Sequence, residues 1–464
     1  MAYGDHSSHF YYSDLENPMG EGKKDALRVN FDKKLKLEFH GVKVTSDAGL
    51  LAYREIDDVF GLTDMAASEL SDNRTGKNTQ HSIAALLRQS IYSRLAGYED
   101  INDAERLSVD PAMRHVVGER AKDKTAASVS LMGRFETEIL TQSQNLKTLM
   151  NQPGHWVDEV HKHKPIEEII LDIDSSDSPT FGRQEGSAYN GHFGYTCYHP
   201  LFIFNQFGDI ERALLRHGNV YSSDDWKSVL EPVVGRYRAE NLARYFRGDA
   251  AFADPNIYCF LETEDYFYAI RLKGNNILYG HIDHLLTRPV GRPPQKPIIQ
   301  YHSFQYQAAS WNKSRRVVAK IEWHSGELFP RIGFIVTNLR WKSSNVVKFY
   351  NKRGTAEQWV KEGKYALKWT RLSCHDFDDN QVRLQLFAMA YNIGNFLRRL
   401  ALPESINDWS LRTMREKLVK IGAKVVSHAR YVTFQMAEVL VSKSLFHEML
   451  AKIHRLKPVL IGYN

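Results

Sequence analysis

The fifteen-residue stretch Tyr350–Lys364, YNKRGTAEQWVKEGK, constrains this chain more than any other part of its sequence. A tyrosine is followed there, at offsets of three, seven and fourteen residues, by an arginine, a glutamate and a lysine: Tyr350, Arg353, Glu357 and Lys364. At about 100° per residue, one helix would carry all four within roughly 60° of arc. Such a stripe is ordinarily a solvated face with weak ion pairs. A carboxylate that can hold a metal ion, placed among cations that can hold phosphate, is also compatible with a site that cuts DNA.

The spacing of these four residues, with gaps of two, three and six, resembles the signature of DDE transposases from bacterial insertion sequences. Every identity and every gap fits this signature, and the resemblance extends over about residues 167–402. The four-residue signature is its specific part, because the other expected site residues are assigned by their order and context. The resemblance implies a ribonuclease H-like core whose site is formed by three carboxylates from separate elements.

The pattern of apolar residues predicts an α/β chain, in which strands dominate first after residue 167 and helices mix in later. Glu167–Ile173 is typical of a buried strand, and Thr79–Leu95 of a helix whose Arg88 and Arg94 are candidates to face DNA. Further strands are expected at 192–203, 210–217, 266–273 and 331–338, a strand end and turn at 244–251, and helices at 224–242, 255–263 and 379–402. The expected fold is a ribonuclease H-like mixed sheet with flanking helices, an all-β insertion before the last catalytic acid, and a helical N-terminal domain.

The length of 464 residues, of which 43% are apolar, allows two or three domains with cores of their own. Residues 1–160 are expected to form a helical domain that binds DNA ends and begins with a flexible arm. Residues 161–275 would form the first part of the catalytic core, and residues 276–330 a β-strand insertion. The remaining segments are 331–402, the second part of the core with the signature helix, and 403–464, a basic helical tail.

The first of the three carboxylates is expected in the run DIDSSD, where a strand would place Asp172 and Asp174 on the same face. The resemblance favours Asp174, because the family's first acid ends a core strand and is followed by small hydroxyl residues. Asp172 remains the rival first ligand, and Asp177 is interpreted as a turn residue. Asp249 follows a strand-like run and Gly248, so its order and context match the family's second acid. Glu357 is the expected third acid.

Cleavage of a phosphodiester by water needs an activated nucleophile and a stabilised leaving oxygen, and two metal ions can supply both. Carboxylate oxygens are the ligands that Mg²⁺ prefers, so two Mg²⁺ ions are expected at Asp174, Asp249 and Glu357, with Mn²⁺ as a substitute. The resemblance implies that Tyr350, Arg353 and Lys364 contact phosphates beside the cut. One of the tryptophans at positions 311, 323 and 341 is a candidate to stack on an unpaired base, with burial in the core as the commoner role.

These expectations describe a transposase that binds insertion-sequence ends, cleaves them by metal-dependent hydrolysis and transfers the 3′ hydroxyl ends into target DNA. Two alternatives stay open at this point. One is a ribonuclease H-like nuclease without strand transfer, and the other is a catalytically inactive DNA-binding relative. The expected partner is double-stranded DNA, both terminal inverted repeats and target, bound by a homodimer because two ends must be joined.

The composition is compatible with a polyanionic partner, because the formal net charge is +6 and the isoelectric point is about 8.9. Residues 392–464 hold twelve Lys or Arg against five Asp or Glu, a surplus larger than that of the whole chain. The three cysteines form no CxxC pair, which argues against a zinc ribbon and fits reduced thiols. The N-terminus lacks an apolar signal region, and no 18-residue apolar run exists. We therefore expect a cytoplasmic, nucleoid-associated bacterial protein without a membrane span.

Overall fold

The computed structural model describes residues 27–28, 31, 35–37, 41–75, 79–288, 291, 296–428 and 431–457. The expected flexible arm lies largely outside these residues. Within them, none of the helices combines the length and the apolar character that a bilayer crossing requires. The chain forms a mixed α/β structure around a large mixed sheet, as the sequence predicted in outline.

A sheet of eight strands runs through the molecule in the order β12-β13-β14-β11-β10-β4-β8-β9. The central strands β4, β10 and β11 are parallel to one another, and the other neighbours are antiparallel. Their bounds are β4 Glu168–Ser175, β8 Leu201–Phe204, β9 Ile210–Leu214, β10 Ala243–Gly248, β11 Phe267–Leu272, β12 Ile298–Tyr306, β13 Arg315–Trp323 and β14 Arg331–Thr337.

The central strand β4, EIILDIDS, separates two faces of the sheet. Ile169, Leu171 and Ile173 point into a core on one face, which the helices α8 (Trp226–Tyr237), α9 (Pro255–Thr263) and α10 (Asn276–Ile282) help to build. Asp172 and Asp174 alternate with these residues and therefore point to the other face. That second face carries the helices α11 (Ser343–Asn351) and α12 (Gly354–Glu362).

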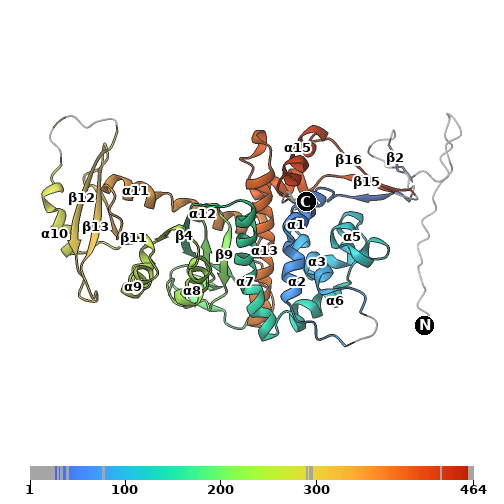
Figure 1. Cartoon of the computed structure of the whole chain (residues 1–464), viewed down its shortest axis with the longest axis horizontal. Helices are drawn as coiled ribbons and strands as arrows, with labels where there is room; N and C mark the ends of the chain where they lie inside the picture. Colours follow the sequence, from blue (N-terminus) through green and yellow to red (C-terminus); the bar gives the residue numbers. More distant parts are fainter. Residues whose placement is uncertain are drawn as a thin grey trace, which may run out of the picture.

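A helical body packs against the β8–β9 end of the sheet, as Figure 1 shows with α7 and α13 between the strands and the N-terminal helices. One continuous apolar core joins these helices to residues of β8 and β9. The helices are α1 Leu50–Phe60, α2 Leu62–Glu69, α3 Ile83–Leu95, α4 Ala104–Leu107, α5 Pro111–Val117, α6 Val129–Arg134, α7 Ser143–His163, α13 Phe377–Ala401 and α15 Lys443–His454.

Helix α13 covers the edge of the sheet at β9. Gln381 accepts a hydrogen bond from the backbone of Leu215, and Gln385 donates one to the carbonyl of Ala213. Asn392 both accepts from and donates to the backbone of Ile210. These amides lie at offsets of four and eleven residues, hence along one stripe of the helix. They satisfy backbone groups that an uncovered edge strand would leave unpaired.

Two segments differ from the sequence-based expectation. The insertion expected to be all β contains α10, which begins where the Asn275 side chain accepts a hydrogen bond from Leu278, and its strands β12 and β13 extend the main sheet. The tail expected to be helical also contains a hairpin, whose strand β15 pairs with β3. β-Branched residues, such as the two valines of KVVS, favour these strands. The bounds are α14 Leu411–Met414, β15 Ala423–Ser427, β16 Val432–Met436 and β3 Lys43–Thr45.

The remaining strands are short. They are β1 Leu27–Arg28 with β2 Lys36–Leu37, and β5 Ser178–Pro179 with β6 Ala188–Asn190 and β7 Tyr195–Tyr198.

In α3, the prediction that Arg88 and Arg94 face DNA is wrong. Both are buried, and they pair with Asp64 at 2.5 Å and with Glu136 at 2.9 Å, because α3 is enclosed by neighbouring helices.

Candidate functional site

The two aspartates of β4 occupy different environments although they share one face of the strand. Asp172 is completely buried and lies opposite Arg247 in the neighbouring strand β10. Arg247 donates to both carboxylate oxygens, at 2.7 and 2.5 Å, and its remaining nitrogen Nη1 donates to the carbonyl of Phe349 at 3.0 Å. This pair leaves Asp172 closed off from solvent, so the rival first ligand lies apart from the other candidate acids.

Asp174, Asp249 and Glu357 converge at the carboxyl ends of the parallel strands β4 and β10. Asp174 is two residues further along β4 and has a side chain 13% exposed, whereas that of Asp249, just after β10, is 38% exposed. Asp249 accepts a hydrogen bond from the Ala251 amide at 2.8 Å, which fixes the turn it begins. Glu357 lies in the first turn of α12 and is 60% exposed. Parallel pairing brings the two strand ends to one edge, and α12 brings the third acid.

The guanidinium of Arg353 lies among these three carboxylates. Its Nη2 is 3.0 Å from an oxygen of Asp174 and 3.8 Å from one of Asp249, and its Nη1 is 3.5 Å from one of Glu357. Burial raises the pKa of Asp174 to about 6, opposed by Arg353 and reinforced by the charges of Asp249 and Glu357. One guanidinium therefore balances only part of the negative charge of three acids.

The signature residues do not lie on one helix, so that part of the prediction is wrong. Helix α11 ends at Asn351, a turn contains Arg353, and α12 begins at Gly354. A π-helical turn, Gly363–Leu367, then carries Lys364. The wider turn accompanies close packing at Gly363, where an added Cβ would lie 2.1 Å from the Trp369 ring. Tyr350 therefore lies in an α-helix, Arg353 in a turn and Lys364 in a π-helical turn.

Lys364 has a partner that the sequence did not indicate. Its ammonium group donates to Asp177 at 2.6 Å, and the hydroxyl of Tyr195 donates to the other oxygen of Asp177 at 2.5 Å. Burial raises the pKa of Asp177, but the bonds from Lys364 and Tyr195 hold it below its ordinary value. Asp177 is thus more than a turn residue. Its position three residues after Asp174 was the available signal, but the pairing depends on the tertiary fold.

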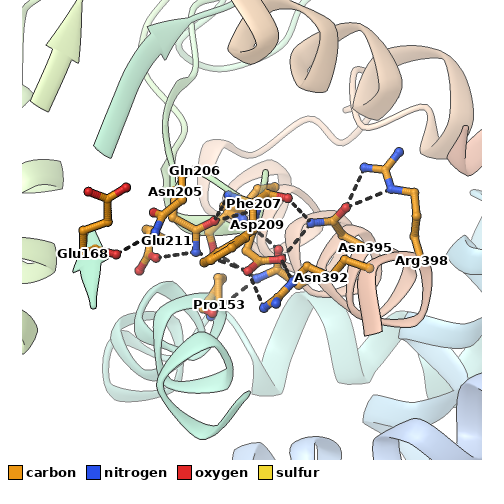
Figure 2. Close-up of polar contacts among 12 residues, drawn as sticks. Pro153, Glu168, Asn205, Gln206, Phe207, Asp209, Glu211, Asn392, Asn395 and Arg398 are labelled. Atoms are coloured by element: carbon orange, nitrogen blue, oxygen red, sulfur yellow. Dashed lines mark hydrogen bonds and ion pairs between the residues drawn. The ribbon is translucent and has the colours of Figure 1, made fainter. Parts of the chain in front are cut away.

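A buried polar network fixes the far end of α12. Arg398 of α13 donates to both oxygens of Glu362 at 2.8 Å and to the side chain of Asn395 at 2.5 Å. Asn395 donates in turn to Asp209, in the turn between β8 and β9, at 2.7 Å. Figure 2 shows Arg398, Asn395 and Asp209 of this network, where α13 meets α7 and that turn. The helix that carries Glu357 is therefore tied through α13 to the sheet that carries Asp174.

The tryptophans divide into two groups. Trp311 and Trp323 are each 6% exposed and belong to the core, the commoner role. Trp341 is 39% exposed and lies 5.7 Å from the ring of Tyr245 and 5.5 Å from that of Phe349, measured between ring centroids. Trp341 is therefore the member of the three that offers surface to a ligand.

The donor chemistry of the three acids fits a hard divalent cation, since carboxylate oxygens are what Mg²⁺ prefers. The arrangement of the three acids in this structure, however, does not fit such a cation. Among residues 41–75, 79–288, 296–428 and 431–457, no group of three or more His, Cys, Asp or Glu is placed to hold a metal ion. Arg353 lies between the carboxylates where a shared ion would need to approach them.

Comparison with known proteins places the chain in a family. A family model described as "Transposase DDE domain group 1" matches residues 27–458. A search of curated proteins found no match. Because the family model covers nearly the whole chain, this protein belongs to the DDE-domain transposases of group 1.

Proposed function

We propose that this protein binds the ends of a DNA element, hydrolyses the phosphodiester at each end, and transfers the freed 3′ hydroxyl into target DNA. The observation that carries this proposal is the convergence of Asp174, Asp249 and Glu357 from three separate elements at one edge of the sheet. Membership in the DDE-domain transposases supports it. We assign the three acids as the catalytic carboxylates of a ribonuclease H-like core, with Asp172 as a structural residue.

The side chains around the acids suit a phosphate backbone. The planar guanidinium of Arg353 can form two parallel hydrogen bonds to a phosphate, whereas the ammonium group of Lys364 acts as a compact point charge. Tyr350, the third proposed phosphate contact, is half-buried, and burial raises the pKa of its phenol, so it donates as a neutral hydroxyl. Transposases of this family generally use divalent metal ions, and two Mg²⁺ or Mn²⁺ ions would supply an activated water and a stabilised leaving oxygen.

The rest of the chain would position DNA. We assign the helices before residue 160 to recognition of the terminal inverted repeats, and the basic segment 403–464 to phosphate attraction or pairing of two ends. The segments 161–275, 276–330 and 331–402 would be the first part of the core, its insertion and its second part. Joining two ends requires a homodimer in the DNA complex. The substrate places this work at the bacterial nucleoid, in the cytoplasm.

The test is cleavage of DNA that carries the element's own ends, with Mg²⁺ and with EDTA, by wild type and by Glu357→Gln. Glu404→Gln is the matched control, because it removes one exposed acid outside the proposed site. We expect metal-dependent nicks at the ends from wild type and Glu404→Gln, and none from Glu357→Gln, which should still bind the ends.

Three outcomes would contradict or narrow the proposal. Equal cleavage by wild type and Glu357→Gln would show that this acid is not catalytic. End-specific binding by folded wild type without cleavage at any metal concentration would favour an inactive DNA-binding relative. Cleavage without joining of the 3′ ends to a second DNA would restrict the function to that of a nuclease.

A further inference from the structure

We infer that Arg353 is an internal counterion that keeps divalent cations out of the acid site until phosphate draws it away. Three carboxylates suit a metal ion by their chemistry, yet in the described part of the chain they are not positioned to hold one. This mismatch leads to the inference. The guanidinium of Arg353 lies 3.0, 3.8 and 3.5 Å from oxygens of the three acids. The exclusion of metal rests on this geometry, and the role of DNA phosphate rests on the proposed function.

The charge balance favours exchange of this guanidinium for a metal ion. Three ionised carboxylates around a single positive charge leave two negative charges uncompensated, and a divalent cation would compensate more of them. The path to the site is open from solvent, because Asp249 and Glu357 are 38% and 60% exposed. The site is thus accessible to an ion but already holds a cation that belongs to the chain.

Arg353 is bound less completely than its neighbour Arg247. Arg247 donates hydrogen bonds from Nε, Nη1 and Nη2, and two of them form a paired contact with Asp172. Among the residues that the structure describes, Arg353 meets the acids only through Nη1 and Nη2, and its buried Nε has no hydrogen-bond partner. A side chain that is held by its outer nitrogens loses fewer contacts when it moves away.

Arg353 lies in the turn between α11 and α12, outside the regular part of either helix. A phosphate close to the acids would offer Arg353 a bidentate partner that carboxylates at 3.5 and 3.8 Å do not provide. Arrival of DNA would then release the acids at the moment when a metal ion is required.

The test measures Mn²⁺ binding to the full chain without DNA, by titration calorimetry, for wild type, Arg353→Gln and Lys361→Gln. Lys361 is an exposed cation on α12 with no assigned site role, so its variant removes the same charge. We expect Arg353→Gln to bind Mn²⁺ at least about tenfold more tightly than wild type, and Lys361→Gln to stay within about twofold. Adding Asp174→Asn to Arg353→Gln should abolish the gain, which would locate the ion at these acids.

A second titration includes duplex DNA that carries the element's ends. Wild type should then approach the Mn²⁺ affinity of Arg353→Gln, whereas the variant should change little. An Arg353→Gln protein that binds Mn²⁺ no more tightly than wild type would overturn the inference. A gain without DNA, combined with no response to DNA, would overturn the phosphate step alone. These readouts need no cleavage, so failure of the proposed function would be seen separately.

Arg353→Lys covers the case in which Arg353→Gln does not fold. It keeps one positive charge, but a compact ammonium cannot present two separated nitrogens to three acids. We expect Mn²⁺ affinity between those of wild type and Arg353→Gln, together with a larger increase in thermal stability on adding Mn²⁺ than wild type shows. An unchanged affinity in a folded Arg353→Lys protein would count against the inference.

Discussion

Two aspartate–arginine pairs meet the same face of β4 two residues apart, and they differ in solvent access and in charge balance. Asp172 and Arg247 are 0% and 3% exposed and match each other with paired hydrogen bonds. Arg353 faces Asp174 and two further acids, and part of the cluster is open to solvent. The first pair lies within the strands, whereas the second lies where they end.

The comparison shows that neither residue type nor spacing distinguishes a structural ion pair from a candidate site. The Asp172 pair is complete, so removing one partner would leave a buried charge without compensation. The Asp174 cluster has more acids than cations, so it can accept a ligand. Burial and charge balance therefore separate the two roles, and graded substitutions can test this.

The largest effect is expected for Asp172→Asn. The substitution leaves the buried Arg247 without its anionic partner, and breaking such a pair costs about 3–5 kcal/mol of stability. Urea unfolding followed by circular dichroism measures the change. Asp174→Asn is the matched control and should lose cleavage while staying within about 1 kcal/mol of wild type, since it relieves repulsion among the acids. Equal destabilisation by both variants would break the distinction drawn between the two pairs.

A smaller loss is expected for Glu362→Gln, which tests a second closed pair. Glu362 is 9% exposed and accepts two hydrogen bonds from Arg398. The glutamine amide has nearly the same shape as the carboxylate but lacks its charge, so the contact with Arg398 would weaken. We expect a loss of about 1–3 kcal/mol in urea unfolding. Cleavage by the folded variant should also fall, because α12 carries Glu357. Full stability would mean that the pair of Glu362 and Arg398 does not hold α12.

Asp177→Asn tests a pair of intermediate exposure. Asp177 and Lys364 are 18% and 21% exposed, so we expect a stability loss of about 1 kcal/mol. The change frees Lys364 for phosphate, and binding to end DNA at low salt should tighten by roughly threefold to tenfold. Fluorescence anisotropy at two salt concentrations measures this. Weaker binding would instead identify Asp177 as the residue that positions Lys364.

The smallest effect is expected for Arg412→Ala, which removes the most exposed of the ion pairs compared here. Arg412 and Glu416 form an exposed pair, 65% and 52% accessible, one helical turn apart. Water already solvates both charges, so the unfolding midpoint should stay unchanged within error. A loss as large as that of Asp177→Asn would show that burial does not rank these pairs.

Local patterns were sufficient for two elements of the core, although not for the break between α11 and α12 that sets the places of Arg353 and Glu357. The run EEIILDI predicted a strand, and the structure has β4 there, which continues to Ser175. The helix expected at 255–263 coincides with α9. These segments carry strong apolar periodicity, and Pro255 after Asp254 marks a helix start. By contrast, α10 lies in a region dominated by β-forming residues, where the capping residue Asn275 decided the local structure.

The sequence by itself determined the family, the mixed α/β fold in outline and the candidate residues, because fixed identities at fixed gaps and local periodicity are carried by neighbouring positions. The tertiary structure alone decided which aspartate of β4 is closed off, where the signature helix breaks, and which acid Lys364 meets. The physical reason is that burial and charge balance arise from residues distant in the chain. Arg247 lies 75 positions from Asp172, and Lys364 lies 187 from Asp177.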